Sequence, residues 1–452
     1  MTAPCAIYWF RNDLRLHDNP SLLRAIDASA TLVCVYCHET PAVSGPWGFE
    51  RLGPHRRRFL AQGLSSLRAA LEAVGQVLVE CAGDPGVVLK AIAESLGTDL
   101  IFSEAIEAPE EIESIRDLRA RGLTVHTTWQ SSLLDPLALP FDVDRLPDVF
   151  TEFRQRIEGE GVRPPAALPS PTRWPAAPAG CLPQSRDFPL PEAFHERGSS
   201  FPYREPPFAG GEKNALLHLS QYLERRLPDT YKQTRNALSG VDFSSKFSPW
   251  LAQGSLSARW IFERLAGYEA RVGANEGTYW LWFELLWRDY FRFLHFKYGK
   301  RLYRPEGLGQ SPPTGHDAVA FKAWCQGKTG HPLIDAGMRE LFLTGYLSNR
   351  MRQIVASYLV HDLTCDWRSG AAWFESQLID YDVYSNQGNW LYIAGLGTDP
   401  RGGRRFNPDK QAKTYDPDGA YSAYWLNATL GEPESPPGSG RRPSPALTPD
   451  RA

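Results

Sequence analysis

The sequence predicts two folded parts, an α/β domain at the N-terminus and an all-helical domain at the C-terminus. Over the first 130 residues, short apolar runs alternate with segments of helical periodicity. This alternation is typical of a doubly wound parallel sheet with helices on both faces. After a proline-rich stretch, apolar residues recur at helical spacing to about residue 426. The chain of 452 residues is long enough for two or three domains.

Five apolar runs in the first part predict the strands of a five-stranded parallel sheet. They span Ile7 to Phe10, Thr31 to Tyr36, Val77 to Glu80, Leu100 to Phe102 and Thr124 to Thr127. The segments between them predict helices at Ser21 to Ala28, Arg56 to Val74, Asp84 to Leu96 and Pro109 to Arg121. The sequence has no G-x-G-x-x-G after the first strand and no P-loop, so the usual dinucleotide or triphosphate site of such a sheet is unsupported.

We place the domain boundaries where the composition changes. The α/β domain is expected at 1–135, an extended proline-rich connector at 136–212, the helical domain at 213–430 and a disordered tail at 431–452. Helices of the second domain are predicted at Ala215 to Arg226, Ser257 to Ala270, Thr278 to Phe296, Ile334 to Thr344, Ser348 to Leu363 and Gly370 to Leu378.

Composition limits the partners and the compartment. The net charge of −3 gives the chain no overall basic character, so a polyanion would need a local patch. Seven cysteines without regular spacing predict buried thiols in a reducing compartment. Cys34 and Cys37 lie in an apolar run that predicts a strand, which would place the two thiols on opposite faces, so neither a redox nor a metal site is predicted. Since the sequence has no signal peptide and no membrane-spanning run, we expect a cytoplasmic protein, by default a monomer.

The segment at 373–392, WFESQLIDYDVYSNQGNWLY, is the strongest indication of a binding site. It combines the carboxylates Asp380 and Asp382, the amide Asn386 and the rings of Trp390 and Tyr392. Hydrogen-bonding groups among stacking walls suit a large planar cofactor. A calcium loop is disfavoured because the central Gly and the closing Glu are absent. A buried aromatic helix capped by Asp residues stays open as the alternative.

Two further clusters place charge near hydroxyl or aromatic groups. The segment SSKFS at 244–248 provides three hydroxyls and a cation, which suit a phosphate group, although a serine-rich loop is the alternative. Glu284 and Arg288 are four residues apart in an almost continuously apolar run. They could form a surface ion pair, but their apolar setting indicates buried charges with a partner or a function.

A third cluster, NRMR at 349–352, places an amide and two cations on one turn. Either arginine alone could belong to a solvated basic face. Basic groups among aromatic residues also suit nucleic acid, where cations hold phosphates and rings stack on bases. Arg352 could pair with Asp380, which would keep a buried carboxylate ionised.

Together these motifs resemble those of the photolyase and cryptochrome family. WFRNDLRLHDNPSL at 9–22 resembles the opening of the family. KFSPWLAQGSLSAR, FELLWRDYFRF, GKTGHPLIDAGMREL, NRMRQ and QLIDYDVYSNQGNWLY resemble its flavin-domain motifs in order and spacing. The resemblance extends from about residue 5 to about residue 426 and is greatest to cryptochrome DASH.

The resemblance implies that FAD is bound in the helical domain. It implies that Arg352 and Asp380 pair beside the isoalloxazine, that Asp382 meets its N3 and O4 edge, and that Asn386 lies at N5, where it tunes the flavin. The other implied FAD contacts are Tyr231, Ser244, Ser245, Lys246, Phe247, Ser248, Trp280, Arg288 and Asn349.

The resemblance also implies light-driven repair of cyclobutane pyrimidine dimers by reduced FAD. Glu284 would bond the flipped dimer, Trp287 and Tyr392 would flank it, and Arg350 would contact DNA. The expected partner is single-stranded DNA carrying such dimers, because an unpaired lesion costs less to extrude; RNA stays open as a further partner. The alternative is a blue-light receptor that binds nucleic acid or another partner and signals the flavin state without repair.

Departures from the family pattern affect the expected electron-transfer chain and the expected antenna site. Trp390 and Trp367 match the first two tryptophans that pass electrons to FAD in the family, but the third position is Thr314, which leaves Trp324 as another possible exit. Glu107 aligns with the folate-binding Glu of the family, whereas the neighbouring Ile106 does not match the residue that the family has at its position. We expect a methenyltetrahydrofolate antenna, with an empty or differently filled site as the alternative.

Overall fold

The computed structural model describes residues 3–38, 47–178, 198–310 and 315–428. Five parallel strands form one sheet in the order β3-β2-β1-β4-β5, which confirms the predicted α/β class. The strands are β1 (Ala3–Phe10), β2 (Ser29–His38), β3 (Leu78–Ala82), β4 (Leu100–Glu104) and β5 (Thr124–Thr128).

Helices cover both faces of this sheet, as a doubly wound fold requires. Side chains of α1 (Pro20–Ala28) and α2 (Pro54–Glu72) pack on one face, and those of α3 (Pro85–Leu96) and α4 (Pro109–Ala120) on the other. Each of the four helices begins at a proline, whose fixed φ and missing N–H suit a first helical position. Cys34 and Cys37 belong to the cores on opposite faces, as their spacing predicts.

A helix lies within the segment that the sequence predicts to be an extended connector. This helix, α5 (Phe150–Gly159), buries Phe150, Phe153 and Ile157 against the helical domain. The spacing of three and then four residues places these side chains on one helical face. The prediction of an extended chain was wrong over these residues. The predicted tail at 431–452 lies outside the described residues.

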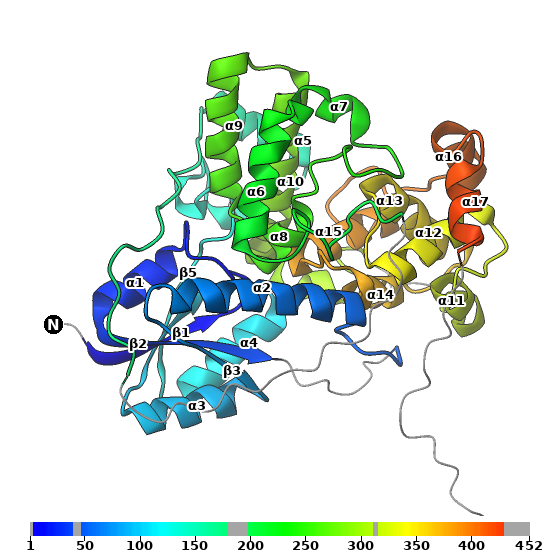
Figure 1. Ribbon diagram of the computed structural model, residues 1–452. Helices are drawn as coiled ribbons and strands as arrows, with labels where there is room; N and C mark the ends of the chain where they lie inside the picture. The colour runs from blue at the N-terminus through cyan, green and yellow to red at the C-terminus, as the bar shows by residue number, and fades with distance from the viewer. Residues whose placement is uncertain (1–2, 39–46, 179–197, 311–314, 429–452) are drawn as a thin grey trace, which may run out of the picture.

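From residue 198 to residue 428, the described residues form helices and turns without a strand. Figure 1 shows α2 running along the boundary between the sheet and these helices, where Gln253 Nε2 donates to Phe59 O at 3.0 Å. No helix that the structure describes is long and apolar enough to cross a membrane. The helices are α6 (Glu212–Glu224), α7 (Tyr231–Thr234), α8 (Ser248–Gln253), α9 (Ala258–Val272), α10 (Glu276–Tyr298), α11 (Ala318–Cys325), α12 (Pro332–Thr344), α13 (Asn349–Ser357), α14 (Trp367–Gln377), α15 (Val383–Ala394), α16 (Pro408–Tyr415) and α17 (Ala420–Leu426).

Two helices of this domain carry predicted site residues. The 23-residue α10 begins with a capping box in which Asn275 and Thr278 bond each other's backbone N–H groups. The segment from Ser348 to Leu363, predicted as one helix, is α13 followed by a π-helical turn at Tyr358–Asp362. Such turns often mark functional sites, and α13 carries the predicted NRMR cluster.

Candidate functional site

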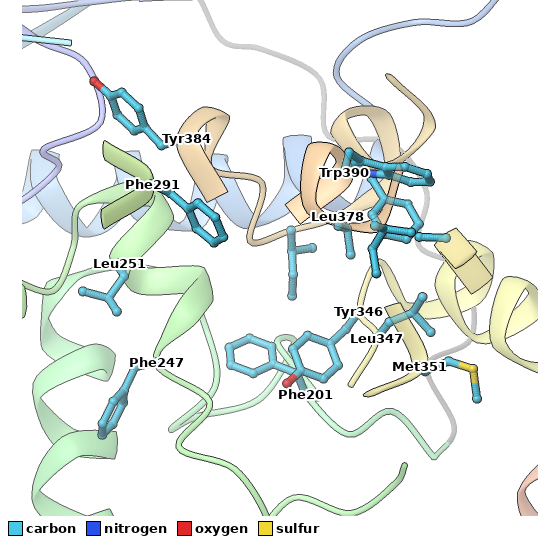
Figure 2. Close-up of a cluster of buried hydrophobic side chains, with 14 of the residues drawn as sticks. Phe201, Phe247, Leu251, Phe291, Tyr346, Leu347, Met351, Leu378, Tyr384 and Trp390 are labelled. Atoms are coloured by element: carbon cyan, nitrogen blue, oxygen red, sulfur yellow. The ribbon is translucent and has the colours of Figure 1, made fainter. Parts of the chain in front are cut away.

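A cavity of about 330 Å³ opens in the helical domain between α7, α8, α10, α13 and α15. Figure 2 shows three of its lining side chains, with Leu251 and Phe291 toward the left of the view and Leu347 toward the right. The cavity brings together most of the predicted site residues: Tyr231, Ser244, Ser245, Lys246, Phe247, Ser248, Glu284, Trp287, Arg288, Asn349, Arg352, Asp380 and Tyr392.

A second cavity of about 90 Å³ shares Arg352 and Asp380 with the first. The remaining predicted residues of the aromatic segment, Asp382, Asn386 and Trp390, line this second cavity. The two cavities therefore meet at the Arg352 and Asp380 side chains, and together they hold all the residues implied to contact a flavin except Trp280.

Four predicted residues lie elsewhere. Trp280 packs against Phe283 with ring centroids 4.3 Å apart, and the cations of Lys232 and Arg235 lie over its ring. Arg350 donates to Asn236 Oδ1 at 3.1 Å. The indole N–H of Trp367 donates to Pro305 O at 2.9 Å, and the backbone N–H of Glu107 bonds the Tyr384 hydroxyl at 2.6 Å.

Arg352 and Asp380 form the predicted ion pair, with Arg352 Nη2 2.8 Å from Asp380 Oδ2. The Ser248 hydroxyl donates to the same oxygen at 2.7 Å, so Ser248 is engaged by Asp380. Burial lowers the pKa of Arg352, but Asp380 outweighs burial and leaves the pKa above its usual value. Asp380 Oδ1 is buried with no hydrogen-bond partner among the described residues, so it can accept a bond from a donor on a bound ring system.

Asp382 has a structural role in addition to its place in the smaller cavity. Its Oδ1 accepts a hydrogen bond from the N–H of Ser385 at 2.8 Å and caps α15. This cap agrees with the alternative interpretation of the segment as a buried helix capped by Asp residues. Its Oδ2 lies 2.8 Å from Arg292 Nη2. Burial raises the pKa of Asp382, but Arg292 and Arg288 outweigh burial and hold the pKa below its usual value. Asp382 is therefore an ionised carboxylate.

The hydroxyl-rich segment holds a buried amine beside the cavity. Ser244 and Lys246 adopt positive φ angles of 63° and 59°, a conformation that side chains other than glycine rarely adopt. Lys246 Nζ lies 3.8 Å from the ring centroid of Phe243 and 3.5 Å from the Tyr346 hydroxyl. Burial lowers the pKa of Lys246 to about 7, against the opposing effect of Glu340. An anion such as a pyrophosphate would favour the charged form of this amine.

Glu284 pairs with a residue that the sequence analysis did not select. Arg235 Nη2 lies 2.6 Å from Glu284 Oε1, whereas Arg288 donates to the carbonyl oxygens of Ser131 and Leu251. The surface pair between Glu284 and Arg288 is therefore not formed. Burial raises the pKa of Glu284, with Arg235 opposing this effect. Arg235 follows Tyr231 by four residues, and this spacing is the sequence signal that could have identified it.

Two aromatic rings stand near Glu284 in the cavity wall. The ring centroids of Trp287 and Tyr392 are 6.3 Å apart with an interplanar angle of 69°. Phe150 stacks on Trp287, and the Arg404 guanidinium lies over the Tyr392 ring at 5.0 Å. A carboxyl group near two such rings suits a planar heterocycle with polar edges.

Behind the smaller cavity, aromatic side chains continue into the core. Trp390 meets Phe374 at 5.1 Å and Trp324 at 6.4 Å between ring centroids. Trp324 is fully buried, and its indole N–H donates to Val355 O at 3.0 Å. The Asn386 amide donates to Ala371 O at 3.0 Å. Thr314 lies outside the described residues, but Trp324, the other possible exit named from the sequence, lies edge-on to Trp390.

A further cavity of about 120 Å³ lies where the α/β and helical parts meet. Its lining includes Arg11, Arg51, Arg56 and Glu111, and the predicted antenna residue Glu107 is not in it. Arginines on an interface cavity suit a ligand with carboxylate groups. Within the described part of the chain, no group of three or more His, Cys, Asp or Glu side chains could hold a metal ion.

The larger cavity meets the requirements of a flavin dinucleotide. Lys246 provides a cation for the phosphates, and the buried Asp380 Oδ1 provides an acceptor for a ring N–H. Two family models match the chain. One, described as DNA photolyase, covers residues 6–172, and the other, described as FAD binding domain of DNA photolyase, covers residues 280–434. Glu284, Arg352 and Asp380 lie within the second match.

Curated and solved proteins resemble nearly the whole chain. A Gloeobacter violaceus protein named cryptochrome DASH is 44% identical over 445 residues, which cover 96% of this chain and 87% of that protein. The crystal structure of a Synechocystis cryptochrome has a TM-score of 0.89 at 41% identity and covers 94% of this chain and 89% of that one. A class III photolyase from Agrobacterium tumefaciens has a TM-score of 0.80 at 30% identity, with 94% and 87% covered.

Proposed function

We propose that this chain, which belongs to the DNA photolyase and cryptochrome family, uses FAD and blue light to split cyclobutane pyrimidine dimers in single-stranded DNA. One observation carries the proposal. Glu284, Trp287 and Tyr392 line the same cavity as the Arg352–Asp380 ion pair. A carboxyl group near two aromatic rings suits an extruded pair of pyrimidines, and this arrangement opens next to the flavin-binding groups.

In this proposal the residues that hold FAD divide into two groups. Lys246, Ser244 and Ser245 would face the pyrophosphate, and Arg352 and Asp380 would lie beside the isoalloxazine. When bound in its reduced form, FAD would supply on illumination one electron, which opens the cyclobutane ring and is returned once the ring has split. Burial of the reacting groups in the cavity would limit their contact with water and strengthen the interactions of the charged side chains.

Glu284 would hold the lesion through a proton. Because burial raises its pKa, its carboxyl group keeps a proton to a higher pH than an exposed Glu does. A protonated carboxyl can donate a hydrogen bond to a pyrimidine carbonyl, and Arg235 at 2.6 Å keeps the side chain facing the cavity. Trp287 and Tyr392 would stack on the bases.

The preference for single strands follows from the cost of extruding the lesion. A paired dimer must be unstacked and unpaired before it can enter the cavity, whereas an unpaired dimer avoids much of this cost. Tyr392 offers a smaller ring than an indole, so it offsets less of the cost for a duplex. An extruded dimer in RNA could bind in the same cavity, because stacking on the bases does not depend on the sugar.

We also propose an antenna chromophore at the boundary between the two parts, with methenyltetrahydrofolate as the expected molecule. The arginine-lined cavity of about 120 Å³ supports a ligand with carboxylate groups at this boundary. Glu111, rather than Glu107, lines it. Mass spectrometry of the chromophores released from gently purified protein would identify the molecule; a flavin or no second chromophore would contradict the folate.

The test of the repair proposal uses purified, photoreduced holoprotein and a single-stranded oligonucleotide that contains one thymine dimer. Blue light should restore the thymines, and the Glu284→Ala variant should lose most of this activity while it keeps FAD. If the FAD-loaded and reduced protein repairs no substrate, the proposal is wrong, and a blue-light receptor that binds nucleic acid or a partner becomes the better account.

A further inference from the structure

Trp287 is stacked from behind by a residue of the connector. The rings of Phe150 and Trp287 have centroids 3.7 Å apart and an interplanar angle of 13°. Phe150 is only 6% exposed and lines a cavity of about 60 Å³ that is distinct from the large one. Trp287 lines both cavities. Its indole therefore forms part of the wall between them, with one face covered by Phe150.

Phe150 is itself held by edge contacts. Its ring meets Phe283 at 5.2 Å and 82° and Tyr290 at 5.6 Å and 73°, both T-shaped arrangements. These residues belong to α10, the helix that also carries Trp287. The phenyl ring is thus fixed on the same rigid element as the indole that it covers.

Polar contacts fix the start of α5 on the same helix. The hydroxyls of Tyr290 and Tyr298 donate to the carbonyl and the carboxylate of Asp148, respectively, and Lys297 Nζ lies 2.6 Å from Asp148 Oδ1. All three donors come from α10. The approach of Phe150 to Trp287 is therefore set by anchors two residues earlier in the chain.

Tyr392, the second aromatic ring of the cavity wall, contacts a loop that also bonds the Tyr290 hydroxyl. The Tyr290 hydroxyl also lies 2.9 Å from Thr398 Oγ1. In this loop Arg404, which covers Tyr392 at 5.0 Å, pairs with Asp399 at 2.9 Å. The supports of both wall rings thus meet at one hydroxyl group.

We propose, resting on the function proposed above, that Phe150 is a positioning residue that fixes the indole plane of Trp287 before the lesion arrives. An indole without this support would lose rotational freedom on binding, and that loss weakens binding. With Phe150 in place, the uncovered face of Trp287 is presented to an extruded pyrimidine. Tyr290 secures the support through Asp148.

The test measures binding in the dark, so that it does not depend on repair. The dissociation constants of the holoprotein are compared for a single-stranded oligonucleotide with one thymine dimer and for the same strand undamaged. Phe150→Leu should weaken dimer binding about fivefold and leave binding of the undamaged strand nearly unchanged. Phe150→Tyr keeps the ring and should restore binding. Phe141→Leu is the matched control, because Phe141 packs on Phe153 of the same helix.

A double-mutant cycle separates positioning from a general structural effect. In the Trp287→Ala background, Phe150→Leu should cause no further loss. If Phe150→Leu does not hold FAD, Tyr290→Phe serves as the second variant, because it keeps the ring and removes only the hydroxyl. It should weaken dimer binding about twofold. The inference is overturned, and the proposed function is not, if Phe150→Leu and Tyr290→Phe both leave dimer binding unchanged. The same holds if Phe150→Leu still weakens binding in the Trp287→Ala background. If the wild-type protein does not prefer the dimer, the proposed function fails and the inference fails with it.

Discussion

Arg352 and Asp380 form an ion pair at the point where the two cavities of the helical domain meet, with Arg352 Nη2 2.8 Å from Asp380 Oδ2. Ser248 donates to the same oxygen, and Asp380 Oδ1 is left without a partner. The pair therefore compensates the charge of the guanidinium group while keeping one buried acceptor for a ligand. This arrangement supports the use of the site for a flavin ring.

We expect Asp380→Asn to weaken FAD binding by at least about tenfold, because it leaves Arg352 without its carboxylate. Titration of the apoprotein with FAD would measure the affinity. Asp242→Asn is the control, since it breaks an ion pair with Arg225 in which both side chains are more than half exposed, and such pairs contribute little. Equal affinities of Asp380→Asn and the wild type would contradict the assignment.

Lys246 should make FAD binding take up a proton above neutral pH. Its pKa is about 7 without a ligand, and a bound pyrophosphate would raise it. Calorimetric titration at pH 8.5 in two buffers with different ionisation heats would count the protons, and Lys246→Met should abolish the uptake. Proton release, or uptake that survives in the variant, would show that this amine does not face the phosphates.

The same lowered pKa predicts how the stability of the apoprotein depends on pH. An unfolded Lys titrates near about 10.4, so between pH 7 and that value the unfolded chain binds a proton that the folded chain lacks. The free energy of unfolding should therefore rise with pH across this window and level off above it. Denaturant melts of wild-type and Lys246→Met apoprotein would reveal the contribution as a difference in slope. Parallel curves would contradict the buried, uncharged amine.

Glu284→Gln should retain more repair than Glu284→Ala, since an amide N–H can replace the proton of a neutral carboxyl group. Both variants should bind FAD normally, because Glu284 pairs with Arg235 and does not contact the Arg352–Asp380 pair. Single-turnover repair, measured with the FAD absorption spectrum, would test this order. If Gln is as defective as Ala, Glu284 acts as an ionised carboxylate.

Trp390→Phe should strongly slow photoreduction of bound FAD by an external thiol, because Trp390 lines the smaller cavity beside the Arg352–Asp380 pair. The next step separates two routes. Trp324 lies 6.4 Å from Trp390 between ring centroids, so Trp324→Phe should slow photoreduction as well. Bleaching of the flavin absorption under blue light would follow the reaction. Trp425→Phe is the control for the loss of a core indole, because Trp425 is distant in sequence and buried against α12. A normal rate in Trp324→Phe would favour the route through Trp367.

The sequence predicted those parts of the molecule that local patterns determine. Buried parallel strands such as β1 and β2 are continuous apolar runs, and they were found for that reason. The helix α5 was missed because only Phe150, Phe153 and Ile157 mark its buried face within a proline-rich region. The helix α15 stayed an alternative, since polar residues such as Asn386 interrupt its apolar pattern.

The chemistry of the site was predictable where each partner lies in a recognisable motif, and not where a partner lies outside one. Arg352 and Asp380 were expected to pair because both lie in recognisable segments. The partner of Glu284 was missed, since Arg235 lies 49 residues earlier, directly after a helix of four residues, and only its spacing from Tyr231 marks it in the sequence. The stacking of Phe150 on Trp287 likewise depends on how the connector packs against α10.

The most direct test of light-driven repair on single strands compares one thymine-dimer oligonucleotide in single-stranded and duplex form, under blue light, with reduced holoprotein. We predict efficient repair of the single strand, at least about tenfold less repair of the duplex, and no repair in the dark. Equal repair of both forms would contradict the preference for single strands, and no repair of either would contradict the function itself.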